Sequence, residues 1–252
     1  MKLLGYDYKA RKKKVEEILD GTDAVREVER FPRDEDFTYT NGYKAWAGAI
    51  FVDLRDSTSL FKDKEDVDIA KVIRGFTSEI IEILRKDTDA NDLKEIGIRG
   101  DCVYAIYSAP LKTDLCDILM RAVYINTYIL MLNKLLEERN LPTIKAGIGL
   151  NASPTLSVKA GRKSSGVNNL VWIGTSVPIA AKLADLGDKD GIKSIVMSDT
   201  FYDNIKESTR AEELKINELY EQGYNINYGF YHHGNAVIGN FEAWILDGMK
   251  DE

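Results

Sequence analysis

The stretch AIFVDLRDSTSLF, residues 49 to 61, decides the fold. Its first half is a continuous apolar run of strand length, which predicts a central strand buried on both faces. That strand ends on the carboxylate of Asp53, and a charged pair, Arg55 and Asp56, follows almost at once. A buried strand that ends on charged side chains needs a chemical explanation, and the rest of the sequence provides one.

The composition is ordinary for a globular protein. A chain of 252 residues with 44% hydrophobic and 30% charged residues can form one large domain, or one domain with extensions, around a real core. The net charge of −7 argues against a nucleic-acid partner. No apolar run reaches the roughly 18 residues that span a bilayer, so we expect no membrane partner. Cys102 and Cys116 lack metal-type spacing, which predicts free thiols and a cytoplasmic location.

Hydrophobic periodicity predicts the elements around the opening stretch. After a charged helix at 8–19 and a polar arm at 20–43, we expect a strand from residue 46, a helix at 65–86, a hairpin that turns at 99–101, a helix at 113–139, and strands at 144–151 and 155–160. A loop at 161–169, a strand and helix after it, a strand at 191–198 and a helix at 201–205 follow, and a charged helix and a terminal hairpin around 233–235 are expected within 208–249.

The order of these elements indicates the architecture. From about 46 to 152 it is β-α-β-β-α-β, the ferredoxin-like arrangement, so the predicted fold class is α+β. In that arrangement the first strand and the hairpin are neighbours, and Asp53 and Asp101 meet at the same edge of the sheet. Two adjacent carboxylates repel each other unless a cation lies between them, and oxygen ligands suit Mg²⁺ or Mn²⁺. The pair therefore predicts a two-metal phosphoryl-transfer site, although either Asp alone could simply cap a strand or a turn.

The residues after Asp53 suit a phosphate group. The segment LRDSTS, residues 54–59, offers backbone N–H groups and hydroxyls at the start of a short helix, which is either a phosphate cradle or an ordinary helix cap. Arg55 could contact phosphate or pair with a neighbouring acid, and the sequence favours neither.

Four blocks in this order resemble the class III nucleotidyl cyclase catalytic domain: FVDLRDSTSLF, RGDCVYAIY, AGIGLNAS and VWIGTSVPIAAKLA. The resemblance covers about 45 to 200. It implies a ferredoxin-like cyclase (palm) core with added strands and helices, a catalytic domain at 45–252 after an N-terminal helix and arm at 1–44, and a homodimer with active sites at the interface. It also implies two Mg²⁺ or Mn²⁺ ions on Asp53, Leu54 and Asp101. The substrate would be a nucleoside triphosphate, bound at Leu54, Arg55, Asp56, Ser57 and Thr58 and cyclised with release of pyrophosphate.

The departures from the family pattern concern the base and the ribose. The purine-reading lysine of K-x-x-G-D falls on Gly97, and the base-reading Asp of the last block falls on Val171. The Asn and Arg of that block fall on Pro178 and Lys182. Missing purine readers predict another base, or no activity. Lys182 is expected either to supply catalytic charge at the polyphosphate or to be a solvated helix residue, and Arg162 to contact the triphosphate.

This profile is similar to that of the pyrimidine cyclases of bacterial Pycsar anti-phage systems, which carry DLRxST in place of DIxGFT. That similarity implies UTP or CTP as substrate and a cyclic pyrimidine mononucleotide as messenger for a separate effector. We favour UTP, because no acidic residue stands at the base-reading positions to accept the cytosine amino group. A cytidylate cyclase, an adenylate cyclase with a rebuilt base site and an inactive nucleotide-binding module remain alternatives. Tyr43, Trp46 and Trp172 could narrow the base pocket, or could be core or interface aromatics.

Overall fold

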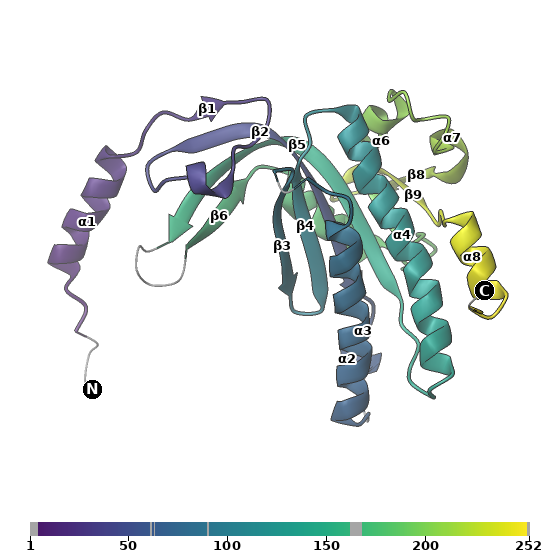
Figure 1. The fold of residues 1–252 in the computed structure, drawn as a ribbon. Coiled ribbons are helices and arrows are strands. Elements are labelled where there is room, and N and C mark those ends of the chain that lie inside the picture. Colours follow the sequence, from purple (N-terminus) through teal and green to yellow (C-terminus); the bar gives the residue numbers. More distant parts are fainter. Residues whose placement is uncertain (1–4, 61, 63, 90, 162–167, 251–252) are drawn as a thin grey trace.

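The computed structural model describes residues 5–60, 62, 64–89, 91–161 and 168–250, and one mixed sheet forms its centre (Figure 1). Its strands are β1 (Arg26–Glu27), β2 (Gly42–Leu54), β3 (Leu93–Arg99), β4 (Cys102–Ser108), β5 (Ala146–Gly161), β6 (Asn168–Ile173), β7 (Ile195–Ser198), β8 (Glu221–Asn225) and β9 (Gly229–Gly234). The order across the sheet is β3-β4-β2-β5-β7-β9-β8, with β1 beside β2 and β6 beside β5. Thus β2, which carries the opening stretch, lies between the hairpin strand β4 and β5.

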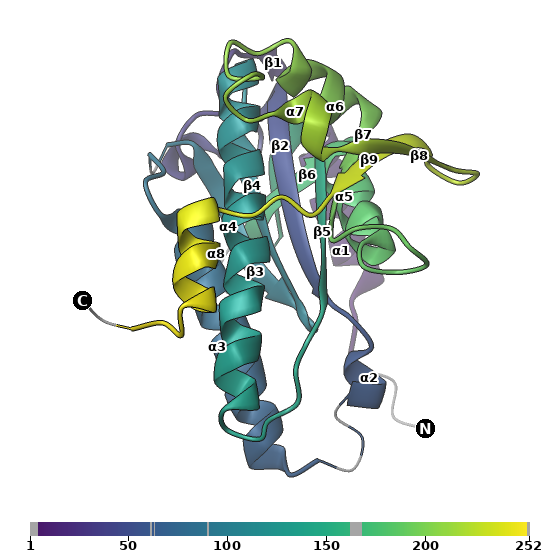
Figure 2. The same ribbon diagram turned by 90° about the vertical axis from the view of Figure 1, so that its right-hand side faces the viewer.

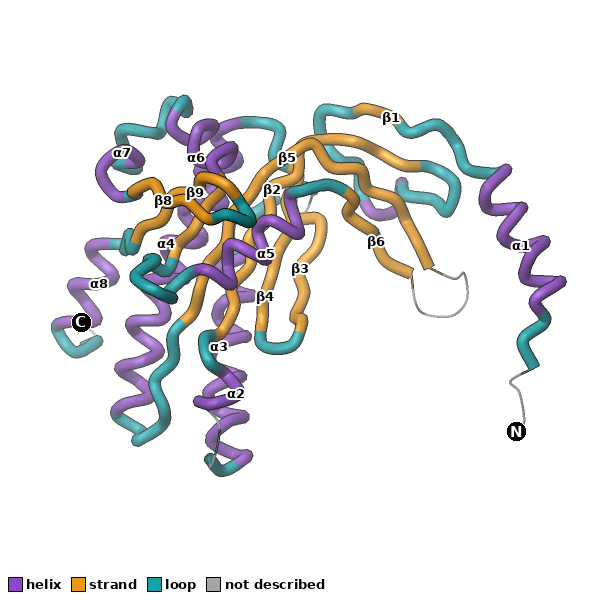
Figure 3. The backbone as a smooth tube through the Cα atoms, turned by 180° about the vertical axis from the view of Figure 1, so that it is seen from behind, coloured by secondary structure: helices purple, strands orange, loops and turns teal. Residues whose placement is uncertain are grey.

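The helices are α1 (Tyr8–Asp20), α2 (Ser57–Leu60), α3 (Asp66–Arg85), α4 (Lys112–Glu137), α5 (Ser176–Leu186), α6 (Asp199–Lys206), α7 (Ile216–Leu219) and α8 (Gly239–Leu246). Among them α3 and α4 lie side by side against one face of the sheet, while α5 lies on the other face (Figures 2 and 3). The apolar side chains of α3 recur at every fourth position, Val72, Phe76, Ile80 and Leu84, so that they form a single buried stripe. The predicted βαββαβ order is therefore present, as β2, α3, β3, β4, α4 and β5.

Helix α4 is long and apolar enough to cross a membrane by length and composition alone. In this fold most of it is buried, with Leu115, Ile118, Leu119 and Ile125 packed in the largest apolar cluster of the protein. Its apolar character is therefore accounted for by its position in the core.

Three local predictions were wrong. The strands expected at 144–151 and 155–160 are one strand, β5. Pro154 is tolerated there because β7 pairs with β5 only as far as Leu150, and β6 only from Leu156, so the residues between face no partner on that side. The terminal hairpin turns between Asn225 and Gly229, not at 233–235. Where a charged helix was expected after residue 208, turns lead into the short helix α7, and α8 follows the hairpin without having been predicted.

The N-terminal arm packs onto the same sheet face as α5. Phe31 and Phe37 are buried in a small cluster with Tyr43, and Trp172 and Tyr104 pack against that cluster. Helix α1 has no buried residue and stands apart from the sheet (Figure 1). Since β1 pairs with the first residues of β2, arm and main domain share one sheet, and the division between 44 and 45 remains a prediction.

Candidate active site

Strand register brings the two predicted metal-binding aspartates together. Asp53 lies near the end of β2, directly opposite Cys102, the first residue of β4. Asp101 precedes Cys102 in the two-residue turn of the β3–β4 hairpin, where Gly100 has φ +65°. The two carboxylates therefore share one edge of the sheet, as the sequence predicted.

Arg55 is the residue that positions Asp53. Its side chain is only 2% exposed, and its guanidinium donates to a carboxylate oxygen of Asp53. It also donates to the Asp53 carbonyl oxygen, at 3.3 Å from Nε and 3.2 Å from Nη2, and to the Asp185 carbonyl oxygen at 2.9 Å from Nη1. Of the two predicted roles, the structure shows the pairing with an acid: the buried fork of Arg55 fixes the direction of the Asp53 carboxylate.

The electrostatics around Asp53 suit a bound cation. Burial raises the pKa of Asp53 above its usual range; Arg55 opposes this, while Asp101 and Asp185 raise it further. A divalent ion would relieve this repulsion, and Arg55 occupies only one of the two Asp53 carboxylate oxygens. Among the described residues no group of three or more acidic, His or Cys side chains is arranged around a metal position. The donor set therefore fits an ion such as Mg²⁺ that takes its remaining oxygens from substrate and water.

A pocket of about 500 Å³ opens beside these residues. Its lining contains Asp53, the first five residues of the predicted phosphate-binding segment and three residues that the sequence did not single out: Asp53, Leu54, Arg55, Asp56, Ser57, Thr58, Lys62, Asp185 and Lys189. The two lysines bring positive charge to this pocket, which suits an anionic group. Lys62 lies just past the predicted turn, and local sequence gives no signal for it.

Asp185 and Lys189 reach the pocket because α5 packs very closely on β5. A Cβ atom at Gly147 would lie 2.1 Å from the Ala184 carbonyl oxygen, and one at Gly149 would lie 2.0 Å from that of Ala180. The glycines of the AGIGL block thus allow the end of α5 to approach the end of β2. Within this pair Lys189 donates to Asp185 at 2.7 Å.

The remaining predicted site residues lie elsewhere. Lys182 is exposed on α5, with its Nζ 5.6 Å from the ring centroid of Tyr228, and it does not line the Asp53 pocket. Val171 is 41% exposed, whereas its neighbours in β6, Leu170 and Trp172, face the cluster under the arm. Arg162 falls outside the described residues.

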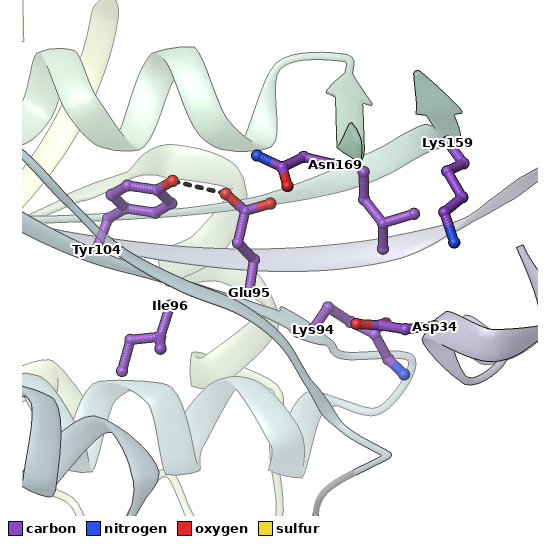
Figure 4. A pocket seen from close by; sticks show the side chains of 8 residues that line it. Asp34, Lys94, Glu95, Ile96, Tyr104, Lys159 and Asn169 are labelled. Carbon is purple, nitrogen blue, oxygen red and sulfur yellow. Dashed lines mark hydrogen bonds between the residues drawn. The ribbon is translucent and has the colours of Figure 1, made fainter. Parts of the chain in front are cut away.

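A second pocket, of about 440 Å³, is drawn in Figure 4. Its lining comprises Asp34, Lys94, Glu95, Ile96, Tyr104, Lys159, Asn169 and Leu170. It borders Gly97, whose missing side chain makes room for Tyr104, since a Cβ atom there would lie 2.7 Å from the Tyr104 hydroxyl. Tyr104 in turn stacks on Phe51, two residues before Asp53 on β2, so one face carries both pockets.

Glu95 fixes the wall of this second pocket. Its two carboxylate oxygens accept hydrogen bonds from the Tyr104 hydroxyl at 2.6 Å and from Trp172 Nε1 at 2.7 Å. Burial, and then the bond to Glu95, raise the pKa of Tyr104 to about 12, so this hydroxyl keeps its proton. Trp172 also packs edge-on against Phe31 of the arm, with ring centroids 5.1 Å apart.

Two of the three candidate pocket aromatics lie elsewhere. Tyr43 is buried against Phe37, and Trp46 packs against the core on the α3–α4 side. Trp172 alone of the three contacts the wall of the second pocket. Sequence reasoning did not identify Glu95, because Glu95 lies two residues before Gly97, the position at which the family carries its purine-reading lysine. No acid stands at the base-reading positions themselves, but Glu95 stands two residues from one of them.

Solved structures share the fold. The chain matches an adenylyl cyclase of P. aeruginosa, CyaB, with a TM-score of 0.62 and 15% identity over 77% of this chain and 95% of that one. It matches the guanylyl cyclase Cya2 with a TM-score of 0.60 and 15% identity over 78% of this chain and 95% of that one. At this identity the likeness shows the fold, which is that of the class III cyclases.

Sequence relatives are more specific. No family model matches the sequence. A uridylate cyclase of Treponema porcinum is 41% identical over 249 residues, covering 99% of this chain and 84% of the relative. A uridylate cyclase of Gulbenkiania mobilis is 28% identical, covering 98% of this chain and 96% of that protein. The chain therefore belongs to the uridylate cyclase family and has the class III nucleotidyl cyclase fold, as its four sequence blocks predicted.

Proposed function

We propose that this protein is a uridylate cyclase, which converts UTP to 3′,5′-cyclic UMP and pyrophosphate. The observation that carries the proposal is the meeting of Asp53 and Asp101 at one sheet edge, beside a pocket with two lysines. The relatives named uridylate cyclases support UTP as the substrate.

The reaction needs positioning and charge neutralisation more than covalent catalysis. The ribose 3′-hydroxyl oxygen forms a bond to the α-phosphorus of the same nucleotide, the bond from that phosphorus to the pyrophosphate oxygen breaks, and the hydroxyl proton leaves with the products. Two Mg²⁺ or Mn²⁺ ions, held by Asp53, Asp101 and the Leu54 main chain, would stabilise the charge that develops on the phosphates.

The residues of the chain divide this work. Arg55 keeps the Asp53 carboxylate in one orientation. Asp185 accepts hydrogen bonds from Arg55 and Lys189 and so links the end of α5 to the end of β2. Lys62 and Lys189 would offset the charge of the β- and γ-phosphates. Ser57 and Thr58 line the same pocket and would donate hydroxyl hydrogen bonds to phosphate oxygens.

We further propose that the active enzyme is a homodimer with its sites at the interface. Lys182 lies outside the Asp53 pocket of its own chain, so a catalytic role for it would require the site of a partner. We place the enzyme in the cytoplasm, where it would supply cyclic UMP to a separate effector in anti-phage defence, as the resemblance to the Pycsar cyclases implies.

Turnover with single nucleotides tests the function. Purified protein is incubated with Mn²⁺ and UTP, CTP, ATP or GTP, and cyclic products are identified by mass spectrometry. Cyclic UMP supports the proposal; cyclic CMP or cyclic AMP as the main product, or no product, contradicts it. Asp53→Ala and Asp101→Ala should each abolish turnover while circular dichroism stays unchanged. Unchanged activity in either variant would refute the metal site.

A further inference from the structure

The second pocket is lined by a hydrogen-bond acceptor of fixed orientation, the Glu95 carboxylate. Both Glu95 oxygens are held by donors, Tyr104 Oη and Trp172 Nε1. Each carboxylate oxygen has two acceptor positions, and one on each is used, so a free acceptor remains on each. Because both neighbouring donors are already bound to it, Glu95 offers a ligand acceptors only, whereas the amide of Asn169 beside it can donate or accept.

The opposite wall offers a donor. Lys159 extends from β5 into the same space (Figure 4). No described residue forms an ion pair with it, whereas Lys94, the other lysine of the pocket, donates to the Pro32 carbonyl oxygen at 3.0 Å. An ammonium group can only donate. The pocket thus pairs an acceptor-only carboxylate with a donor-only ammonium.

This polarity distinguishes the two pyrimidines. Uracil presents the N3–H donor next to the O4 acceptor, whereas cytosine presents the N3 acceptor next to the amino donor. We propose that Glu95 accepts the uracil N3–H and that Lys159 donates to O4, so that these two residues select UTP over CTP. The inference rests on the proposed function and names the residues that read its base. Cytosine would direct its amino group at an ammonium and its unprotonated N3 at a carboxylate, and sites with such mismatched groups reject ligands strongly.

Adenine, like cytosine, presents an unprotonated ring nitrogen next to an amino group, so Glu95 and Lys159 would reject it in the same way. Guanine presents the uracil order, so the pair alone does not exclude it. Its exclusion depends on the space that Tyr104 occupies over Gly97.

Equilibrium binding tests the inference without turnover. The affinities of the non-cyclisable α,β-methylene analogues of UTP and CTP are measured by calorimetry with Mg²⁺ for the wild type and for Lys159→Gln. We expect the wild type to prefer the UTP analogue and Lys159→Gln to lose about tenfold to a hundredfold of that preference, as for one charge-assisted hydrogen bond. Lys134→Gln, an exposed lysine on α4, serves as the matched control. A folded Lys159→Gln protein that keeps the full wild-type preference overturns the inference.

A modified nucleotide tests Glu95 separately. The wild type should bind N3-methyl-UTP much more weakly than UTP, and Glu95→Gln should reduce that difference. An equal penalty in both proteins would show that Glu95 does not contact N3–H. These results are distinct from a failure of the proposed function. If the wild type makes cyclic UMP and both variants keep the wild-type base preference, only the base reading is refuted. Selective binding through Lys159 without any cyclic product refutes only the function.

Discussion

Arg55 determines how well Asp53 can serve as a ligand. Its guanidinium is buried and joins the Asp53 carboxylate, the Asp53 carbonyl and the Asp185 carbonyl. Lysine has one point charge in place of a planar fork and cannot make these bonds together. The residue therefore links the orientation of the metal ligand to the packing of α5.

Replacing Arg55 should weaken metal binding and stability together. In Arg55→Gln the pKa of Asp53 should rise further, because Arg55 is the main group that lowers it. We expect a higher Mn²⁺ concentration for half-maximal turnover, with the largest effect at acidic pH, where more of Asp53 is protonated. The free energy of unfolding should fall by about 2 kcal/mol, as for a charged hydrogen bond. Mn²⁺ titrations and urea unfolding measure the two effects.

The controls for this prediction are Arg55→Lys and Arg139→Gln. Arg55→Lys should not restore Mn²⁺ affinity, and Arg139→Gln, at an exposed position just after α4, should behave as wild type. An Arg55→Gln protein with wild-type metal dependence would show that Arg55 has no part in positioning Asp53.

Gly97 should tolerate no side chain. A Cβ atom there would lie 2.7 to 2.9 Å from three atoms of Tyr104, so Gly97→Ala should displace that ring and break its bond to Glu95. We expect kcat/KM for UTP to fall about tenfold, as for the loss of one such hydrogen bond. At Gly239 an added Cβ meets nothing within 4 Å, and Gly239→Ala should leave turnover unchanged. Equal kinetics for the two variants would contradict this account of Tyr104.

Among the elements, the C-terminal hairpin of β8 and β9 is a structural unit with its own pH dependence. His232 stacks on Tyr202 with ring centroids 3.5 Å apart, and His233 Nδ1 accepts from the Lys193 backbone N–H at 3.1 Å. Burial lowers the pKa of both histidines below the ordinary value of 6.5. Both are therefore neutral in the fold under conditions where the unfolded chain already binds protons.

Stability should consequently fall as the pH drops through about 6.5, because the unfolded state then binds more protons than the folded state. Urea unfolding at about pH 7.5 and about pH 5.5 measures the effect. In a protein with both His232→Phe and His233→Asn the difference between the two pH values should shrink. A difference that persists unchanged would assign the pH dependence to other groups.

The elements also show what the sequence can predict. Periodic apolar residues located β2, α3, the β3–β4 hairpin and α4 closely, because each element has one buried face or stripe. The pattern divided β5 at Pro154, since sequence does not show where a strand lacks a partner. It misplaced the terminal hairpin because the turn at 225–229 depends on an αL glycine, Gly229, rather than on the Gly234 that local composition favoured.

Over the whole molecule, the sequence predicted the juxtaposition of Asp53 and Asp101 because topology alone brings them together. It could not predict Lys62, Asp185, Lys189, Glu95 or Lys159 as site residues. Asp185 and Lys189 reach the Asp53 pocket because α5 packs on β5. Lys159 reaches the second pocket because strands far apart in the chain pair with one another. Such long-range contacts leave no periodic signal in the residues themselves.

Subunit exchange tests the proposed dimer. If Lys182 acts at the partner's site, neither Asp53→Ala nor Lys182→Ala is active alone, but a mixture allowed to exchange subunits is. Each mixed dimer then contains one intact site, so an equal mixture should recover about a quarter of wild-type activity. A mixture no more active than its components, under conditions where exchange is demonstrated, would contradict a site shared between chains.

Competition between nucleotides tests whether the Asp53–Asp101 edge and its neighbouring pocket form a uridylate cyclase. The protein is given an equimolar mixture of UTP, CTP, ATP and GTP with Mn²⁺, and the cyclic products are counted by mass spectrometry. We predict cyclic UMP as the dominant product, with none from Asp101→Ala. A dominant product other than cyclic UMP, or cyclic UMP from Asp101→Ala at the wild-type rate, would contradict the account.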